Sequence, residues 1–438
     1  MIKSKASLKD NVEVELLLED KPNPLWKWLF YGGGGGLLLC SGLLVVAGVF
    51  LMPTLVPQAR IAWCRPDCQG IDLAQLDLAH SWIFSHDLSH LNLVEAQLRH
   101  ANLPQVNLQG SDLLKANLYK TNLQKGHLNQ VVLAESTLIE ADLRGADLTE
   151  ADLQGADLTR ANFMGADLSY ANLTGATIEG IILRGTTLHG TDLTGLDLRD
   201  LDLRGTDLQG ANLSYTRLAG TDLGGADLRE ATLNGANLRD SKIDDQTQLD
   251  PKWRLAWGVI NELSIGRDLQ GTDLSYVKLT GANLRQASLY QANLQESDLG
   301  GVDLRGADLR QVNLIGAGLG QTNLSEANLQ GAKLGGASLW RAQLISADLS
   351  GADLSSTVVG ATNALRQTNL RGATLYATNL SGANLQGADL SGATMISANL
   401  LGADFTGAIL TEVDLTAAIY NDLTKWPQGF VPNGAIKQ

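Results

Sequence analysis

Cysteine, histidine and aromatic residues are scarce in this chain of 438 residues, which has 3 Cys, 6 His and only 5% Phe, Trp and Tyr. Cys64 and Cys68 lie close together, but no second cysteine pair completes a familiar zinc-binding spacing. The sequence also has no Ser-His-Asp spacing in a strand–turn–helix context, no phosphate-binding loop and no dinucleotide-binding turn. We therefore predict that the protein is not an enzyme and has no catalytic, cofactor-binding or metal-binding residues.

Positive charge is in short supply as well. The chain has 33 Lys and Arg against 47 Asp and Glu, which gives a formal net charge of −14. A surface with this balance repels phosphate groups, so direct nucleic-acid binding is disfavoured. The same acidity is compatible with a protein that imitates the charge of DNA.

One long stretch has no charged residue at all, from Trp28 to Ala59. It exceeds the roughly 20 residues that a membrane-spanning helix needs. Trp26 and Tyr31 suit the membrane interface on one side. We predict a transmembrane helix over residues 29–56. A cleaved signal peptide is the alternative, but the long neutral leader and the lack of a clear A-x-A site favour an uncleaved anchor.

The charges around this stretch indicate the orientation only weakly. Five lysines precede it, and Arg60 and Arg65 follow it. The positive-inside rule leans toward a cytoplasmic tail, which would place the rest of the chain on the non-cytoplasmic side. On that side Cys64 and Cys68 could form a small disulfide, whereas in the cytoplasm they would remain thiols. We predict a single-pass membrane protein.

A five-residue period fills most of the chain. Residues 141–175 read ADLRG-ADLTE-ADLQG-ADLTR-ANFMG-ADLSY-ANLTG, with a bulky apolar residue at every fifth position. On an α-helix this row would spiral around the rod, and on a flat strand it would alternate between faces. The chain must therefore turn a corner every five residues. Gly two positions after the Leu permits the corner, and Asp or Asn one position before it can bond to nearby backbone.

This A-(D/N)-L-x-x motif resembles the pentapeptide-repeat family, and the resemblance covers most of the chain. It implies an all-β solenoid, a right-handed four-sided parallel β-helix with about twenty residues per coil. Members of that family have different functions, so the resemblance predicts the fold far better than the function. Parallel coils would stack at roughly 4.8 Å.

A segment in the middle of the chain breaks the period. It reads DPKWRLAWGVINEL, with Trp253 and Trp257 on one helical face. We expect an amphipathic α-helix with Asp250 as its N-cap, Pro251 at its first position and Gly266 at its end. The segment resembles an interlude in membrane-associated members of the family from photosynthetic bacteria. A cap or spacer, a partner-binding helix and a hinge all fit it.

The repeats resume after this helix and slip by one residue near 360–365, which we interpret as a bulge at one corner. We expect two stacked arrays, and a C-terminal cap built around Trp426 and Phe430. We predict seven segments: a polar tail (1–28), the transmembrane helix (29–56), a linker (57–70), the first array (71–243), the helical interlude (244–268), the second array (269–420) and the cap (421–438).

A coil of twenty residues would bring certain outward side chains together. His80 and His100 would stack on one edge, with His90 on the opposite side, so at most two metal ligands converge. One outward row would be Arg144, Met164, Arg184 and Arg204. Another would carry no charge and suit docking: Val94, Leu114, Ala134, Gln154, Thr174, Thr194, Ser214 and Asn234. Outward apolar residues are also expected in the second array, at Tyr290, Ile315, Trp340, Ile345, Ile396 and Leu401.

The leading functional hypothesis is a membrane-tethered, non-catalytic scaffold or protein-interaction rod that supports the assembly or regulation of a membrane complex. Its partners would be proteins of unknown identity, and a homodimer is possible. The alternative is an acidic, DNA-mimicking rod that binds a topoisomerase or another nucleic-acid-binding protein. The anchor and the interrupting helix argue against this alternative.

Overall fold

The computed structural model describes residues 77–80, 87–262, 265–354 and 368–438, together with four short strands nearer the N-terminus. These strands pair antiparallel, the first with the second and the third with the fourth: β1 (Ala6–Ser7), β2 (Glu13–Val14), β3 (Leu18–Glu19) and β4 (Arg60–Ile61). The predicted span at 29–56, like Cys64 and Cys68, lies outside the described residues. In the parts that are described, no helix combines the length and apolarity that crossing a membrane requires.

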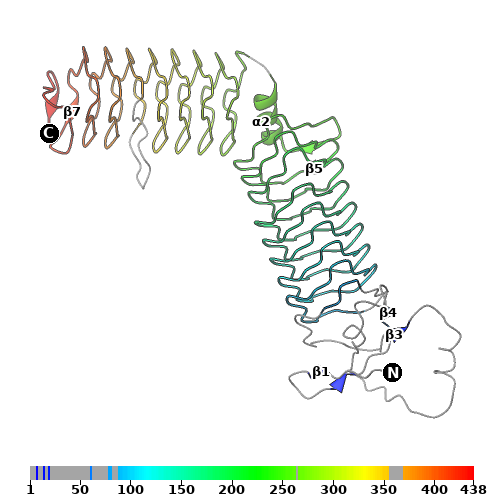
Figure 1. The fold of residues 1–438 in the computed structure, drawn as a ribbon. Helices are drawn as coiled ribbons and strands as arrows, with labels where there is room; N and C mark the ends of the chain where they lie inside the picture. The colour runs from blue at the N-terminus through cyan, green and yellow to red at the C-terminus, as the bar shows by residue number, and fades with distance from the viewer. Residues whose placement is uncertain are drawn as a thin grey trace, which may run out of the picture. The chain divides into compact units, whose positions relative to one another are not determined.

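The chain folds into two compact units. Unit 1 comprises Met1–Thr232 and Ser241–Leu249, and unit 2 comprises Leu233–Asp240 and Asp250–Gln438. Each unit is a stack of coils, visible in Figure 1. Backbone bridges join residues 20 positions apart on every side of the stack, for example Asp142 with Asn162. Four five-residue sides therefore make one coil, as the sequence predicts.

Leu and Ala fill the interior of the coils, because both side chains of each short side point inward. Leu143 and Leu148 are 0% exposed and Ala146 is 1% exposed. The corner position two residues after each Leu has a left-handed backbone, with φ of +65° at Gly145 and +55° at Glu135. Glycine suits this position, and non-glycine residues are strained there because of their Cβ.

The helix α2 (Pro251–Asn261) begins where the sequence predicts, with Pro251 in its first turn, although Asp250 makes no side-chain capping bond. It ends at Asn261, so the expected end at Gly266 is wrong. The Asn261 side chain explains the earlier end. Its Nδ2 donates to the Leu238 carbonyl (3.1 Å), and its Oδ1 accepts the Asp240 N–H (2.7 Å). These bonds fix the end of α2 to a preceding segment of the same unit.

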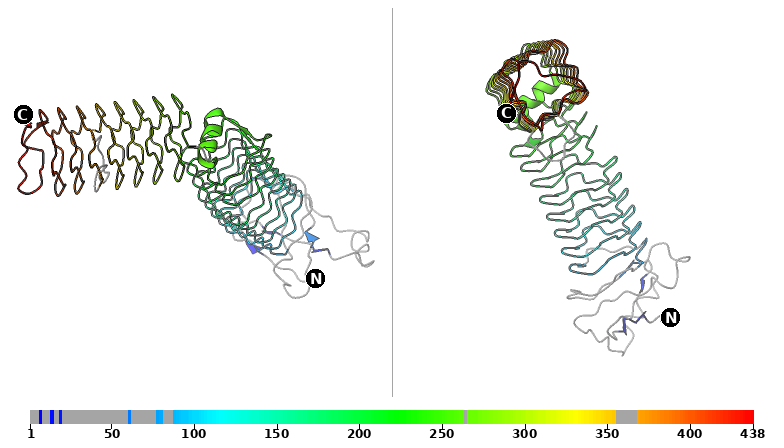
Figure 2. Two further views of the ribbon diagram at one scale, coloured as in Figure 1. Left: turned by 90° about the horizontal axis from the view of Figure 1, so that it is seen from above. Right: turned by 90° about the vertical axis from the view of Figure 1, so that its left-hand side faces the viewer.

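One face of α2 is buried within unit 2, and Figure 2 shows the helix inside the end-on outline of the coils. Trp253 is buried as expected, but the other buried residues are Ala256, Gly258 and Val259, and Trp257 is only partly buried. The Lys252 ammonium lies 3.1 Å from the Asp273 carboxylate in the first coil of the second array. The helix thus covers an end of the second array's core.

The C-terminal end of unit 2 is covered by aromatic residues. Trp426 stacks on the inward-facing Phe405 with ring centroids 5.0 Å apart, and also contacts Tyr420 (5.6 Å) and Phe430 (5.4 Å). The remaining strands pair in parallel, β5 (Asp227–Leu228) with β6 (Gln248–Leu249) in unit 1 and β7 (Ile419–Tyr420) with β8 (Ile436–Lys437) in unit 2.

The frame slip in the second array is larger than a one-residue bulge. Across this region bridged residues are 26 positions apart instead of 20, as in the pair Gln343 and Asn369 and the pair Asp353 and Asn379. One coil therefore holds six extra residues. An insertion of one residue and an insertion of six residues shift the repeat frame by the same amount, because they differ by a whole five-residue period.

The described part of unit 1 contains an interrupted interface, which lies between the coil segments 176–185 and 196–205. On one side the Leu183 N–H does not bond to the Asp202 carbonyl, and the Asp202 N–H does not bond to the Ile181 carbonyl. The equivalent bonds are present two coils earlier, where the Leu143 N–H donates to the Asn162 carbonyl at 2.8 Å. On the neighbouring side the bonds between 178 and 197 are missing in the same way.

Bulky inward residues account for the interruption. The inward position two residues before the Leu is usually small, but here it holds Ile181 and, twenty residues later, Leu201. Overpacking of this kind pushes backbone apart. Elsewhere a large residue at this inward position is followed by a small one in the next coil. Val106 is followed by Gly126, and the His127 N–H still donates to the Val106 carbonyl at 2.8 Å. On the side of Ile181 and Leu201 the interruption therefore coincides with two large residues in direct succession, whereas on the neighbouring side a small residue, Ala176, is followed by Leu196.

Candidate interaction surface

The repeated Asp and Asn side chains are engaged by their own turns. The Asp147 carboxylate accepts the Thr149 N–H at 3.0 Å and the Thr149 hydroxyl at 2.6 Å. The Asn172 side-chain oxygen accepts the Thr174 N–H at 3.0 Å in the same way. This local bond is the corner chemistry that the sequence predicts. It gives these carboxylates a structural role in place of acid–base catalysis.

An Arg that follows the motif neutralises the carboxylate of its own turn. In the sequence Asp-Leu-Arg the guanidinium folds back, so that the Arg144 Nε and Nη2 donate to the Asp142 carboxylate at 2.9 and 2.7 Å. The same bidentate pair forms in six turns of the described coils, whose arginines are Arg144, Arg199, Arg204, Arg229, Arg305 and Arg310. Such pairing reduces the free negative charge on the rod and weighs against DNA mimicry.

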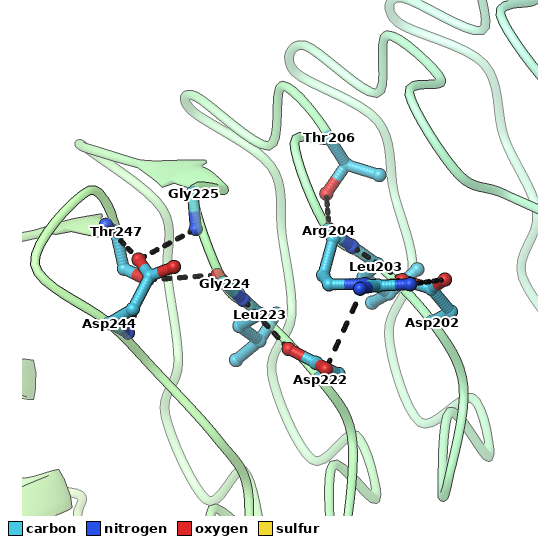
Figure 3. Close-up of polar contacts among 10 residues, drawn as sticks. All are labelled: Asp202, Leu203, Arg204, Thr206, Asp222, Leu223, Gly224, Gly225, Asp244 and Thr247. Atoms are coloured by element: carbon cyan, nitrogen blue, oxygen red, sulfur yellow. Dashed lines mark hydrogen bonds and ion pairs between the residues drawn. The ribbon is translucent and has the colours of Figure 1, made fainter.

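Figure 3 shows how one row of these groups is used. The Arg204 Nη2 lies 2.7 Å from the Asp202 carboxylate, and its Nε lies 3.8 Å from Asp222 in the next coil. The Arg204 hydrogen bonds lower the pKa of Asp202 to about 2. The Asp244 carboxylate accepts the Gly225 N–H at 2.9 Å, and this bond, before others from Thr247, lowers the pKa of Asp244. The carboxylates of this row, Asp202, Asp222 and Asp244, are thus all engaged in bonds that stabilise the coils.

One coil on the same side departs from this pattern. Ile182 occupies the Asp or Asn position, so Arg184 has no carboxylate in its own turn. Ile182 is 45% exposed, and Met164 in the preceding coil is 46% exposed. Arg160, at the adjoining corner, lies over Gly180 in the next coil, with its Cγ 3.3 Å from where a glycine Cβ would be. We call Arg160, Met164, Ile182 and Arg184 the apolar–arginine patch.

The histidines form a pair and no larger cluster within the described residues. The rings of His80 and His100 stack at 4.9 Å with an angle of 9°, as expected for residues twenty apart, and Tyr119 meets His100 edge-on at 5.2 Å. Burial, followed by the charges of His80, Lys120 and Arg99, lowers the pKa of His100. In the same parts of the chain, no three His, Cys, Asp or Glu side chains are arranged to hold a metal ion.

The sequence profile of a family described as Pentapeptide repeats (8 copies) matches more than half of the chain. The matched residues are 92–130, 127–165, 141–180, 171–210, 206–245, 268–306, 292–331, 322–358, 364–395 and 388–419. The chain belongs to the pentapeptide-repeat family. Its repeats therefore form the family's right-handed quadrilateral β-helix, and proteins of this family are generally non-catalytic.

Three solved structures illustrate the similarity of this pentapeptide-repeat protein to others. HetL, a pentapeptide repeat protein involved in heterocyst differentiation regulation in the cyanobacterium Nostoc sp. strain PCC 7120, is 24% identical, with 84% of this chain and 93% of that chain covered and a TM-score of 0.15. The pentapeptide repeat protein alr5209 from Nostoc PCC 7120 is 30% identical over 30% and 86% of the two chains, with a TM-score of 0.16.

The third structure, QnrB1, a plasmid-mediated fluoroquinolone resistance protein, is 16% identical over 56% of this chain and 89% of that chain, with a TM-score of 0.23. No curated protein matched the chain.

The uncharged row of this pentapeptide-repeat protein is less neutral than the sequence suggests. From Val94 to Ser214 its residues do follow one another on one side of unit 1, since bridges on that side join residues twenty apart. The neighbouring row on the same side, however, contains Asp112, Asp152 and Asp192. The side as a whole is therefore acidic, which disfavours it as a neutral docking surface.

The outward apolar residues of the second array do not form one patch. Ile315, Trp340 and Ile345 are 39%, 37% and 39% exposed, but they lie on three different sides of the coil. Tyr290 is partly covered by the Arg310 guanidinium, 5.3 Å from its ring. The apolar–arginine patch differs from these scattered residues, because it brings exposed apolar side chains of adjacent coils together with cations.

The sequence pointed to half of this patch. Met164 and Arg184 belong to an outward row predicted from a coil of twenty residues. Ile182 and Arg160 were missed, although Ile182 carries a visible signal, because Asp or Asn is expected at its position. Arg160 carries no such signal, since its place over Gly180 depends on the three-dimensional register of two coils.

Proposed function

We propose that this protein is a membrane-tethered, non-catalytic interaction rod that supports the assembly or regulation of a membrane complex. One observation carries the proposal: the recurring carboxylates are bonded within their own turns, while at the apolar–arginine patch exposed apolar side chains of two adjacent coils lie beside two arginines that form no ion pair within residues 87–249. Such a distribution provides a surface for recognition and leaves no constellation for chemistry among the described residues.

The tether in this proposal is the uncharged stretch within 29–56. Its length exceeds what a bilayer-spanning helix needs, and its flanks contain aromatic residues suited to the interface. The charge distribution favours a cytoplasmic tail, so we place the repeats on the non-cytoplasmic side. The resemblance of the interrupting segment to membrane-associated members from photosynthetic bacteria supports the membrane tether, but not the sidedness.

Membrane attachment and sidedness can be tested together on the full chain in sealed native vesicles. We expect the protein to stay in the membrane during alkaline carbonate extraction. A membrane-impermeant thiol reagent should label Cys64 and Cys68 from the non-cytoplasmic face, after reduction if the two form a disulfide. Extraction by carbonate would contradict the tether, and labelling from the cytoplasmic face alone would contradict the sidedness.

The interaction role needs a separate measurement. After solubilisation in a mild detergent, we expect the protein to migrate in native electrophoresis as a complex with at least one different protein. A complex that contains only copies of this chain would identify a homo-oligomer instead. A monomer recovered under several mild detergents would contradict the proposal.

A further inference from the structure

The apolar–arginine patch combines one departure from the repeat, at Ile182, with three outward side chains on two bonded coils. The Asn162–Ile182 bridge places Met164 beside Ile182 and Arg184, because the residues on either side of a bridge share one register. The Phe163 N–H donates to the Ile182 carbonyl at 2.9 Å, and the Ile182 N–H donates to the Ala161 carbonyl at 3.0 Å. The coil that carries Ile182 and Arg184 is therefore bonded to the coil that carries Met164, although on this side its bonds to the following coil are missing.

The two arginines of the patch are available to a partner. Within residues 87–249 neither Arg160 nor Arg184 lies in an ion pair, whereas Arg144 and Arg204, in the same outward row as Arg184, are each paired at 2.7 Å. Arg184 lies close enough to the paired Asp202 to contribute to its lowered pKa, but it makes no hydrogen bond to it. Two unpaired guanidinium groups therefore flank exposed aliphatic surface in a protein of net charge −14.

The surface around the patch is open. A Cβ added at Gly165 or at Gly185, the corners on one side of the patch, would have no atom within 4 Å apart from those of the glycine and its two chain neighbours. An extended chain could therefore lie across Met164 and Ile182 without displacing side chains at these corners. Arginine binds a carboxylate with two parallel hydrogen bonds, and this geometry adds specificity to the electrostatic attraction.

We propose that the apolar–arginine patch binds an extended segment of a partner protein in which an aliphatic side chain is flanked by carboxylates. The aliphatic side chain packs on Met164 and Ile182, and the carboxylates pair with Arg160 and Arg184. This inference rests on the proposed interaction function and names the chemistry of its partner. An anionic membrane surface is the less suitable occupant, because it would extend beyond the patch and be repelled by the acidic remainder of the unit, whereas a short acidic segment meets only the patch.

The test uses the full chain in detergent and degenerate nine-residue peptide pools labelled with a fluorophore. One pool alternates Asp or Glu with Leu, Ile or Val, a second replaces the acids by Lys or Arg, and a third keeps the acids but replaces the aliphatic residues by Ser or Asn. Fluorescence anisotropy should show binding of the first pool alone. The proposal is overturned if either of the other pools binds with equal affinity, or if none of the three pools binds.

Variants then locate the binding site. We expect Arg160→Gln combined with Arg184→Gln to weaken binding of the acidic–aliphatic pool by about tenfold or more, and Ile182→Asn to do the same, since central charged and apolar anchors dominate such contacts. Arg144→Gln combined with Arg229→Gln is the matched control, because it also removes two positive charges from the unit, but from arginines that are paired with the carboxylates of their own turns. It should change binding by less than about twofold. Equal effects of the control and the patch variants would overturn the assignment.

A second readout separates this inference from the proposed function. The variant Arg160→Gln combined with Arg184→Gln should bind vesicles that contain anionic phospholipid as well as the unmodified protein does. If the variant binds these vesicles more weakly, and the acidic–aliphatic pool does not bind the unmodified protein, the patch is a lipid-binding surface. If the native complex survives Arg160→Gln combined with Arg184→Gln, and the peptide pool also fails to bind, the patch proposal fails while the interaction function stands.

Discussion

Two pairs of coils on the same side of unit 1 differ in the size of their inward residues. Where Ala141 and Ala161 follow one another, the coils share their backbone hydrogen bonds. Where Ile181 and Leu201 occupy the same positions two coils later, the corresponding bonds are missing from the described residues. The five-residue turn is kept in both pairs, so the turn alone does not ensure that neighbouring coils bond to each other.

The difference shows that the repeat encodes two separable properties. Asp or Asn and the corner residue form each turn locally, as at Asp142 and Asp202, which bond within their own turns. The small inward residue instead sets how closely one coil approaches the next. A solenoid depends on both, because each coil is stabilised chiefly by its neighbours.

The largest expected effect comes from placing large inward side chains in the regular pair of coils, at Ala141 and Ala161. We predict that Ala141→Ile combined with Ala161→Leu opens the bonds between Leu143 and Asn162 and lowers the free energy of unfolding by about 2–6 kcal/mol, since overpacking costs about 1–3 kcal/mol per site. Chemical denaturation of the full chain in detergent, followed by circular dichroism, measures it. Ala141→Ser is the control and should change stability by less than about 1 kcal/mol, as Ser and Thr occupy this inward position elsewhere. Unchanged stability of the double variant would show that bulk is not the cause.

The unmodified protein provides the next comparison. Amide hydrogens of Leu183 and Asp202 should exchange with solvent about tenfold faster or more than those of Leu143 and Asn162, because they lack the bonds between coils. Hydrogen-exchange mass spectrometry on peptides spanning 136–165 and 176–205 resolves the two regions. Equal protection would mean that the coils close in solution.

Much of this architecture is readable from the sequence, because the period, the corner residues and the inward Leu are local signals. The size of the insertion in the second array is not, since a slip of the frame reveals an insertion only to within a multiple of five. The end of α2 was also missed, because it depends on bonds from Asn261 to Leu238 and Asp240. Both errors concern contacts between residues that the local pattern does not relate.

The interrupted interface and the patch are only partly predictable from the sequence. Once a coil of twenty residues is accepted, Ile181 and Leu201 can be placed in one row from the sequence. Whether the coils absorb that bulk or separate depends on their packing, as the compensated pair of Val106 and Gly126 shows. For the patch, Ile182 breaks the motif visibly, but the availability of Arg160 is known only from the three-dimensional arrangement.

A smaller effect should follow from relieving the bulk. In the next coil Thr221 occupies the same inward position as Leu201, and its hydroxyl donates to the Leu198 carbonyl at 2.7 Å. We predict that Leu201→Thr lets the coils approach and raises the free energy of unfolding by about 0.5–1.5 kcal/mol, the net contribution of a typical hydrogen bond. Slower amide exchange at Leu183 should accompany it. Destabilisation with no change in exchange would indicate a cavity in place of a closed interface.

The smallest effect concerns the turn that carries Ile182. The substitution Ile182→Asp would give Arg184 the bidentate partner that Arg204 has in Asp202, and we expect a gain of about 0.2–1 kcal/mol at pH 7, because the pair is exposed. Arg204 lowers the pKa of Asp202 to about 2, below the value of the unfolded chain. A carboxylate shifted in this direction stabilises the fold above its unfolded pKa, and this stabilisation is lost as the pH falls from about 4 to about 2.

The pH dependence therefore separates the ion pair from the turn itself. The control Ile182→Asn can accept the same backbone N–H but carries no charge, so its effect on stability should not change between pH 7 and pH 3. Thermal unfolding of the two variants across this range measures the difference. If both variants respond equally to acid, the Asp-Leu-Arg pairs do not contribute through their charge. The contrast between Arg184 and its paired neighbours would then reflect turn geometry alone, and the availability of Arg184 to a partner carboxylate would lose its electrostatic basis.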